Sequence, residues 1–233
     1  MNSIINYNAR PRYGAKSQIF PLTAIAAALG IKDPYTQGHA RRVAIYARRL
    51  ATRIGLNPAA VENIRLGGLL HDIGKIGLSE RILNNTRNRL SGAMLTEVQQ
   101  QPRIGVAILK NYNFPAAIID LVRYHHEKMD GSGYPHGLMS YQIPLGAKII
   151  RVADCFDAIT TDRPYQQRKS WIEALAILRQ ISGTDLSPVL VTPFIADIKE
   201  NGLALDHTRS ISFYSPVFDR LLPQPGQTGT QND

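Results

Sequence analysis

The segment Leu66-Gly67-Gly68-Leu69-Leu70-His71-Asp72 decides how this 233-residue chain is interpreted. A helix that begins near Pro58 becomes apolar on almost every side at Leu66 to Leu70, and it then delivers an imidazole and a carboxylate together. Burying His71 beside Asp72 is costly unless something compensates both groups, and a metal ion does so. The segment therefore predicts a buried helix end at a metal site.

A second helix is expected to bring histidines to the same place. Its apolar residues Ile118, Leu121 and Val122 form a stripe that runs into His125, with His126 directly beside it. Neighbouring residues on a helix point roughly 100° apart, so such a pair can serve two different metal ions.

Two more helices add candidate ligands. Asp154 and Asp157 share the buried face of one helix, and His39 lies four residues before Val43 on the buried face of another. A lone histidine of this kind is more often a hydrogen-bonded core residue. His-Asp, His-His and Asp at the inner ends of separate helices favour a metal centre instead. Imidazole and carboxylate ligands suit iron, manganese or zinc, and a pair of such ions promotes phosphoester hydrolysis.

Signals of helix starts recur along the chain, whereas alternating strand-like runs are almost absent. Asn57 before Pro58 is a helix cap, and Ser170 with Glu173 forms a capping box. We predict an all-α fold, a compact helical bundle spanning residues 20–202. The predicted flanks are an N-terminal extension at residues 1–19 and a partly disordered tail at residues 203–233. The loop at residues 128–144 is dense in turn residues and is expected to be functional.

The composition limits the classes of partner and the cellular compartment that we expect. The formal net charge of +9 favours anionic partners, but Lys and Arg form no basic run, so no nucleic-acid polymer is expected. No apolar stretch reaches the roughly 20 residues of a membrane-spanning helix, and the first residues do not look like a signal peptide. We therefore expect a cytoplasmic protein without membrane insertion. The single cysteine, Cys155, excludes an internal disulfide and a thiolate metal cage.

Several motifs resemble the signatures of the HD-GYP family, in the family's order. They are His71-Asp72-Ile73-Gly74-Lys75, His125-His126-Glu127 and Asp130-Gly131-Ser132-Gly133-Tyr134-Pro135, with further matches at residues 33–39, 152–154 and 162–165. The resemblance implies a helical bundle of the HD superfamily with a metal centre and a Gly-Tyr-Pro loop. It also implies hydrolysis of the bacterial second messenger cyclic di-GMP to a linear dinucleotide or GMP.

The resemblance further implies roles for single residues. The implied metal ligands, for two divalent ions that are iron or manganese, are His39, His71, Asp72, His125, His126 and Asp154. Asp72 would bridge the ions, and Lys75 would hold the scissile phosphate as its catalytic partner. Tyr134, Asp157 and Arg163 would line the dinucleotide pocket. A homodimer or a regulatory protein partner is also expected.

The chain departs from the family pattern in a few places. Gln101 begins a motif, Gln101-Pro102-Arg103-Ile104-Gly105, that in the family begins with a ligand histidine, and an amide oxygen is a poorer donor. One metal site should therefore be weakened. Tyr35 replaces an acidic residue that supports a third metal in some relatives, residues 85–90 lack a Lys-Pro-Gly turn, and Gln166 replaces a basic residue.

Two rival functions stay open at this stage. One is a domain that binds cyclic di-GMP or a protein partner without catalysis, which Gln101 and Gln166 favour. The other is hydrolysis of a different nucleotide, against which the intact Gly-Tyr-Pro loop argues.

Overall fold

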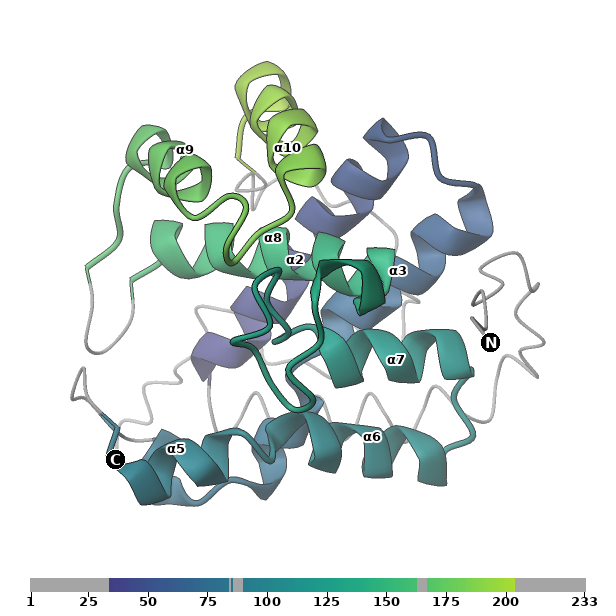
Figure 1. Ribbon diagram of the computed structural model, residues 1–233, viewed down its shortest axis with the longest axis vertical. Coiled ribbons are helices and arrows are strands. Elements are labelled where there is room, and N and C mark those ends of the chain that lie inside the picture. Colours follow the sequence, from purple (N-terminus) through teal and green to yellow (C-terminus); the bar gives the residue numbers. More distant parts are fainter. Residues whose placement is uncertain (1–33, 84, 86–89, 163–166, 204–233) are drawn as a thin grey trace, which may run out of the picture.

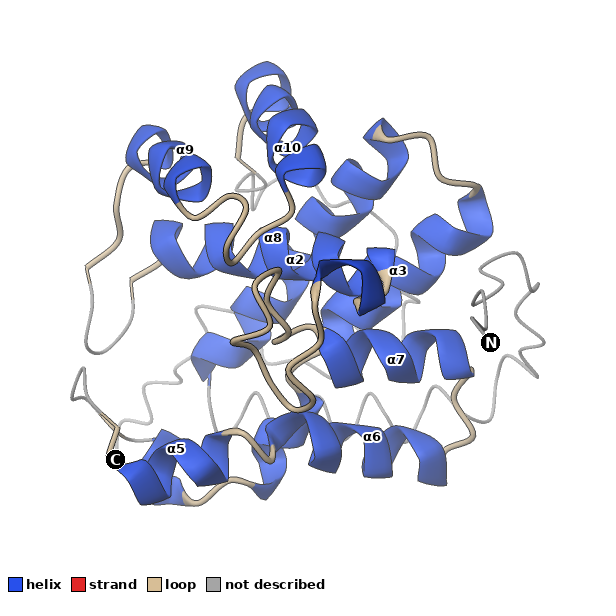
Figure 2. Ribbon diagram, in the orientation of Figure 1, coloured by secondary structure: helices blue, strands red, loops and turns tan. Residues whose placement is uncertain are grey.

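The computed structural model describes residues 34–203, except for residue 84 and residues 86–89 and 163–166. That part of the chain is helical and contains no strand, which confirms the all-α prediction (Figure 2). The elements are α2 (Pro34–Arg53), α3 (Pro58–Leu70), the 3-10 helix η1 (Ile73–Gly77), α4 (Glu80–Leu83), α5 (Gly92–Val98), α6 (Gln101–Asn111), α7 (Ala116–Tyr124), the 3-10 helix η2 (Ser140–Gln142), α8 (Leu145–Thr160), α9 (Trp171–Gln180) and α10 (Pro188–Asn201).

The helices enclose two neighbouring hydrophobic clusters. In the larger one, α2 and α8 lie against each other and α9 and α10 cover them, as the upper half of Figure 1 shows. Its centre is aromatic, since the rings of Tyr46 and Phe156 meet edge to face at 5.2 Å and Phe194 contacts both. The smaller cluster lies between α6, α7 and the end of α3. Helix α3 joins the two, because Ile64 belongs to the first and Leu70 to the second.

Two glycines let the neighbouring helices approach α3 just before its end. A Cβ atom on Gly67 would lie 2.5 Å from Leu121 Cδ1 of α7, and one on Gly68 would lie 3.0 Å from Ala44 Cα of α2. Interiors are packed too densely to absorb such overlaps. The Gly67-Gly68 pair therefore allows α2 and α7 to bring their histidines to the His71 turn.

The local signals read from the sequence are present where predicted. The Asn57 side chain accepts a hydrogen bond from the Ala60 backbone at 2.9 Å, and Ser170 and Glu173 form both bonds of the capping box. The predicted extension and nearly all of the predicted tail lie outside the described residues, so the limits of the domain stay predictions. Among the described helices, none combines the length and the apolar character that a bilayer crossing requires.

Candidate metal centre

The end of α3 presents an imidazole with a defined free nitrogen. His71 Nδ1 lies 2.7 Å from the Gly68 carbonyl oxygen, and because a carbonyl only accepts, this nitrogen carries the proton. The lone pair is therefore on Nε2, which lies 3.4 Å from Asp72 Oδ2. Both side chains are buried. The backbone thus fixes the tautomer that a metal ligand needs.

His125 at the end of α7 repeats this arrangement. Its Nδ1 donates to the Val122 carbonyl oxygen at 2.9 Å, and its Nε2 is buried without a hydrogen-bond partner among the described residues. Burial, together with the neighbouring His71 ring, lowers the pKa of His125 to about 3. The pKa of the adjacent His126 is also lowered, first by burial and then by His125. Both rings therefore stay neutral and keep a lone pair for a cation.

His39 of α2 is held by carboxylates on both of its nitrogens. Its Nδ1 lies 2.7 Å from Asp157 Oδ2, while its Nε2 lies 3.2 Å from Asp154 Oδ1 and 3.6 Å from Asp72 Oδ2. Burial alone would lower the pKa of His39, but its bonds to Asp154 and Asp157 outweigh burial and raise it to about 9. A ring nitrogen that faces two carboxylates marks a position of strongly negative potential, which attracts a cation.

The ligand atoms gather into two groups that share one carboxylate. Among the described residues, the donor atoms of His39, His71 and Asp72 lie within 4.8 Å of one another, and so do those of Asp72, His125 and His126. The predicted ligands thus come together from α2, the α3–η1 turn, the end of α7 and α8, although they are far apart in sequence. Asp72 belongs to both groups, which is the position that a bridging ligand requires.

Lys75 lies beside the shared carboxylate. Its Nζ is 2.7 Å from Asp72 Oδ2, and its side chain is partly exposed. Burial raises the pKa of Asp72, but the neighbouring Lys75 ammonium group, with the nearby His71 and His39 rings, outweighs burial and holds this pKa well below its usual range. Asp72 is therefore an anion that lies among the imidazole ligand atoms and beside the ammonium group of Lys75.

Gln101 lies at the first residue of α6, against the His71-Asp72 turn. Its Nε2 donates to the His71 carbonyl oxygen at 2.8 Å, whereas its Oε1 is buried and has no hydrogen-bond partner among the described residues. The close contact depends on Gly74, because a Cβ atom there would overlap the Gln101 carbonyl oxygen. The residue that stands at the family's histidine position is therefore held against the His71 backbone, with an unsatisfied oxygen.

The Gly-Tyr-Pro loop is tied to the His125-His126 end of α7. The Tyr134 ring stacks on His126 at 4.6 Å between centroids, and the Tyr134 backbone donates to the His126 carbonyl oxygen at 3.3 Å. Glu127 is buried and accepts backbone hydrogen bonds from His136 at 2.8 Å and Leu138 at 2.9 Å. Burial raises the pKa of Tyr134, so its phenol stays protonated.

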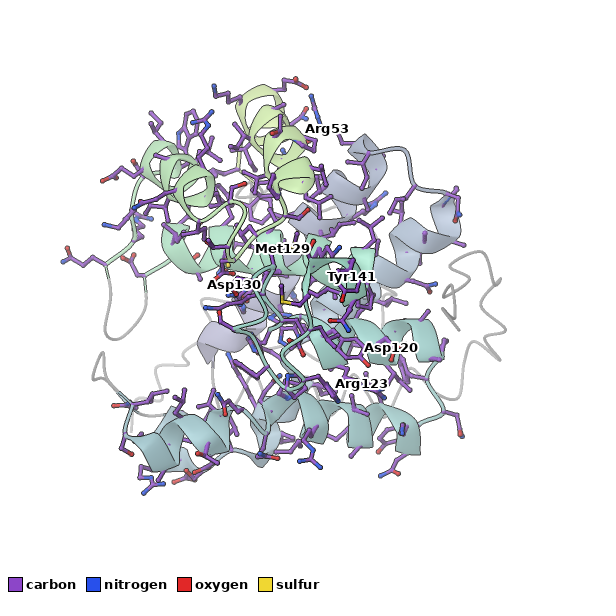
Figure 3. All side chains as sticks on the ribbon, in the orientation of Figure 1. Arg53, Asp120, Arg123, Met129, Asp130 and Tyr141 are labelled. Carbon is purple, nitrogen blue, oxygen red and sulfur yellow. The ribbon has the colours of Figure 1, made fainter. Side chains whose placement is uncertain are left out.

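A second anchor connects this loop with α8. The loop crosses the front of the molecule, where Met129 and Asp130 are labelled in Figure 3, and their backbone nitrogens donate to the Asp185 and Thr184 carbonyl oxygens. The Asp185 carboxylate accepts from Arg151 Nε at 2.8 Å and from Nη2 at 2.9 Å. The ion pair therefore links the loop to the helix that carries Asp154.

The predicted pocket residues lie in different surroundings. Asp157 is 0% exposed and its two oxygens are engaged by His39 and Arg42, and its contact with a dinucleotide stays a prediction. Arg163 lies outside the described residues. Glu127 and Arg42 were given no role, although a carboxylate directly after two buried histidines is a signal of a buried acceptor.

Comparisons with known proteins show what the chain is similar to. Residues 24–188 match a protein family described as HD domain. The chain is 37% identical over 176 residues to a cyclic di-GMP phosphodiesterase of Thermotoga maritima, covering 72% of this chain and 46% of that relative. It is 36% identical over 167 residues to 3'3'-cGAMP-specific phosphodiesterase 3 of Vibrio cholerae, covering 72% of this chain and 36% of the relative. The chain therefore spans less than half the length of these two relatives.

Solved structures share the fold. Bd1817, an HDG"Y"P protein from Bdellovibrio bacteriovorus, superposes with a TM-score of 0.59 and 20% identity, covering 70% of this chain and 52% of that one. The HD domain of the L. monocytogenes phosphodiesterase PgpH, in complex with cyclic-di-AMP, gives a TM-score of 0.58 and 19% identity, covering 80% and 98%. At these identities the likeness establishes the helical architecture.

Proposed function

The chain belongs to the HD domain family, in its HD-GYP branch, and from this premise we propose that it is a metal-dependent phosphodiesterase that hydrolyses cyclic di-GMP. The product would be a linear dinucleotide, GMP or both. The observation that carries the proposal is the sharing of Asp72 by two groups of ligand atoms, in which every residue except the partly buried His126 is buried. Such a pair of adjoining sites is the arrangement that two-metal phosphoester hydrolysis uses.

The donor set fits two divalent transition-metal ions, iron or manganese. His39, His71, Asp72 and Asp154 would hold the first, while Asp72, His125 and His126 would hold the second. The fit rests on His71 and His125, whose Nδ1 protons are held by backbone carbonyl oxygens, and on the buried His125 Nε2, which has no hydrogen-bond partner among the described residues. When bound, the ions polarise a phosphate and lower the pKa of a water.

The surrounding side chains prepare the site for an anionic substrate. Lys75 keeps an ammonium group at the shared carboxylate, where it stabilises negative charge that grows on the phosphate oxygens. Tyr134 stacks on His126 and keeps its hydroxyl proton, so it can donate a hydrogen bond to the dinucleotide. Asp157 holds His39 at Nδ1, in the manner of the carboxylate partners of metal-bound histidines, and Arg42 holds Asp157.

A second substrate deserves the same test, because a relative with 36% identity is named as specific for 3'3'-cGAMP. The two dinucleotides differ in one base, so the metal centre would treat their phosphates alike and the pocket would decide between them. Of the residues predicted to line that pocket, the structure describes Tyr134 and Asp157, whereas Arg163 lies outside the described residues.

A domain that binds the dinucleotide without cleaving it is the alternative that Gln101 favours. If the amide weakens the second metal site, turnover should be slow at low metal concentration and should rise with added manganese or ferrous ion. Replacing Gln101→His should then raise metal occupancy and turnover together. Tight binding of cyclic di-GMP without product, in both proteins and at saturating metal, would identify the non-catalytic alternative.

The proposal is tested by incubating the protein, purified without oxygen and loaded with manganese or ferrous ion, with each dinucleotide. Chromatography should show hydrolysis of cyclic di-GMP, and Asp72→Ala should show none. The proposal fails if the metal-loaded protein cleaves neither cyclic di-GMP nor 3'3'-cGAMP. Preferential cleavage of 3'3'-cGAMP would retain the reaction and correct the substrate.

A further inference from the structure

The orientation of the Gln101 amide is fixed by its hydrogen bond. The nitrogen Nε2 lies 2.8 Å from the His71 carbonyl oxygen. A carbonyl accepts hydrogen bonds and cannot donate them, so only the amide nitrogen can occupy this side. The amide oxygen Oε1 must therefore face the other way. The side chain is 1% exposed, so water from the bulk solvent does not reach it.

Two unsatisfied acceptors flank His71. Gln101 Oε1 is buried without a hydrogen-bond partner in the described part of the chain, and the same holds for His125 Nε2. Gln101 is bonded to the His71 backbone, and the His125 ring lies 5.1 Å from the His71 ring. A buried acceptor left unpaired costs about 1–3 kcal/mol. Neither atom can satisfy the other, because both accept, whereas a cation would satisfy both.

We propose that Gln101 Oε1 is a ligand of the ion held by Asp72, His125 and His126, and that it shifts this position toward hard divalent ions such as manganese. The inference rests on the metal centre proposed above. Amide oxygens suit manganese and magnesium, whereas a third imidazole would favour zinc and the later transition metals. The Gln101 amide is therefore a determinant of metal selectivity as well as a weaker donor.

The geometry makes the two positions chemically unequal. The first group combines His39, His71 and Asp72, with Asp154 Oδ1 3.2 Å from His39 Nε2. The second group combines Asp72, His125 and His126, and the buried Gln101 oxygen is the donor proposed to join it. The first position should therefore bind metal before the second, and the second position should select ions by their affinity for oxygen ligands.

The selectivity is measured by equilibrium dialysis without oxygen against equal concentrations of manganese and zinc, followed by elemental analysis of metal per chain. The metal content of His125→Ala defines the metal retained by the first position. Subtracting that content from the content of the unmodified chain gives the metal held at the second position. Gln101→His should raise the zinc-to-manganese ratio at the second position relative to the unmodified chain, because imidazole suits zinc and an amide oxygen suits manganese. Gln101→Glu, which keeps an oxygen, should stay on the manganese side.

The outcomes separate the inference from the proposed function. An unchanged zinc-to-manganese ratio in Gln101→His, with the first ion retained, overturns the selectivity role and leaves the metal centre intact. Failure of the unmodified chain to retain any ion at excess metal overturns the centre and the inference together. Circular dichroism and thermal unfolding check that each variant folds. If Gln101→Glu does not fold, the comparison of Gln101→His with the unmodified chain still decides the matter.

Discussion

Replacing Asp157→Asn should weaken metal binding without a direct effect on the dinucleotide. The carboxylate accepts a bond from His39 Nδ1 at 2.7 Å and bonds from Arg42 Nε at 2.6 Å and Nη2 at 3.0 Å. Asparagine keeps the shape but replaces one acceptor by an NH₂ donor. When the amide oxygen stays on Arg42 Nε, the NH₂ group faces His39 Nδ1, so a neutral, metal-bound His39 could no longer keep its proton on Nδ1 and would carry it on Nε2.

That nitrogen is the one that faces Asp72 and Asp154, so the wrong tautomer removes a ligand without removing a side chain. Loss of such a supporting partner costs about 10–100-fold in metal affinity, or about 1.4–2.7 kcal/mol. Titration with manganese against a chelator should show this loss at the first position. The Michaelis constant for cyclic di-GMP at saturating metal should stay close to that of the unmodified chain.

The control is Asp120→Asn, which changes a carboxylate of α7 that lies 3.5 Å from Arg123 at the surface of the molecule (Figure 3). It should leave metal affinity unchanged. If Asp157→Asn binds manganese normally but has a raised Michaelis constant for cyclic di-GMP, Asp157 contacts the substrate as the family resemblance implies, and the positioning role is refuted.

Three further changes test other parts of the account. Tyr134→Ala should weaken cyclic di-GMP binding more than manganese binding, and calorimetry with each ligand would show equal losses if the loop instead held the metal. Gly74→Ala should lower the free energy of unfolding, measured in urea, by about 2 kcal/mol or more, because the new Cβ atom would overlap the Gln101 carbonyl oxygen. The control is Gly92→Ala, where the Cβ atom meets open space, and the free energy of unfolding should change by less than about 1 kcal/mol. Burial raises the pKa of the Cys155 thiol to about 12, and only the thiolate is nucleophilic, so the folded protein should react slowly with a disulfide reagent at pH 8. If the folded protein reacted as fast as the protein in urea, the thiol would not be protected by burial.

The helical class could be predicted because its signals are local. The Asn57 cap and the Ser170–Glu173 capping box act within one helical turn, and both form as the sequence indicates. The stripe that ends in His125 also predicted which face of α7 is buried. Such patterns depend on neighbours three or four residues away, so a single sequence is enough to read them.

The partners within the site could not be predicted in the same way. His39 and Asp157 are separated by 118 positions, and nothing local indicates that their side chains meet. The same holds for the Gln101 amide and the His71 carbonyl oxygen, which are 30 positions apart. The family resemblance supplied candidate ligands and pocket residues, whereas the orienting groups and loop anchors depend on how the helices pack. Glu127 illustrates this, because its sequence position shows a carboxylate and only the fold shows the two backbone groups that it binds.

The central claim is that one carboxylate, Asp72, serves two metal positions, and the metal content of two alanine variants tests it most directly. Each variant is loaded with excess manganese without oxygen and passed through a desalting column. The number of ions per chain is then measured, and it should differ between the two variants. Asp72→Ala should retain neither ion, because both groups of ligand atoms include its carboxylate. His125→Ala should retain the first ion and lose the second. Retention of one ion per chain by Asp72→Ala, equal to that of His125→Ala, would contradict the shared carboxylate.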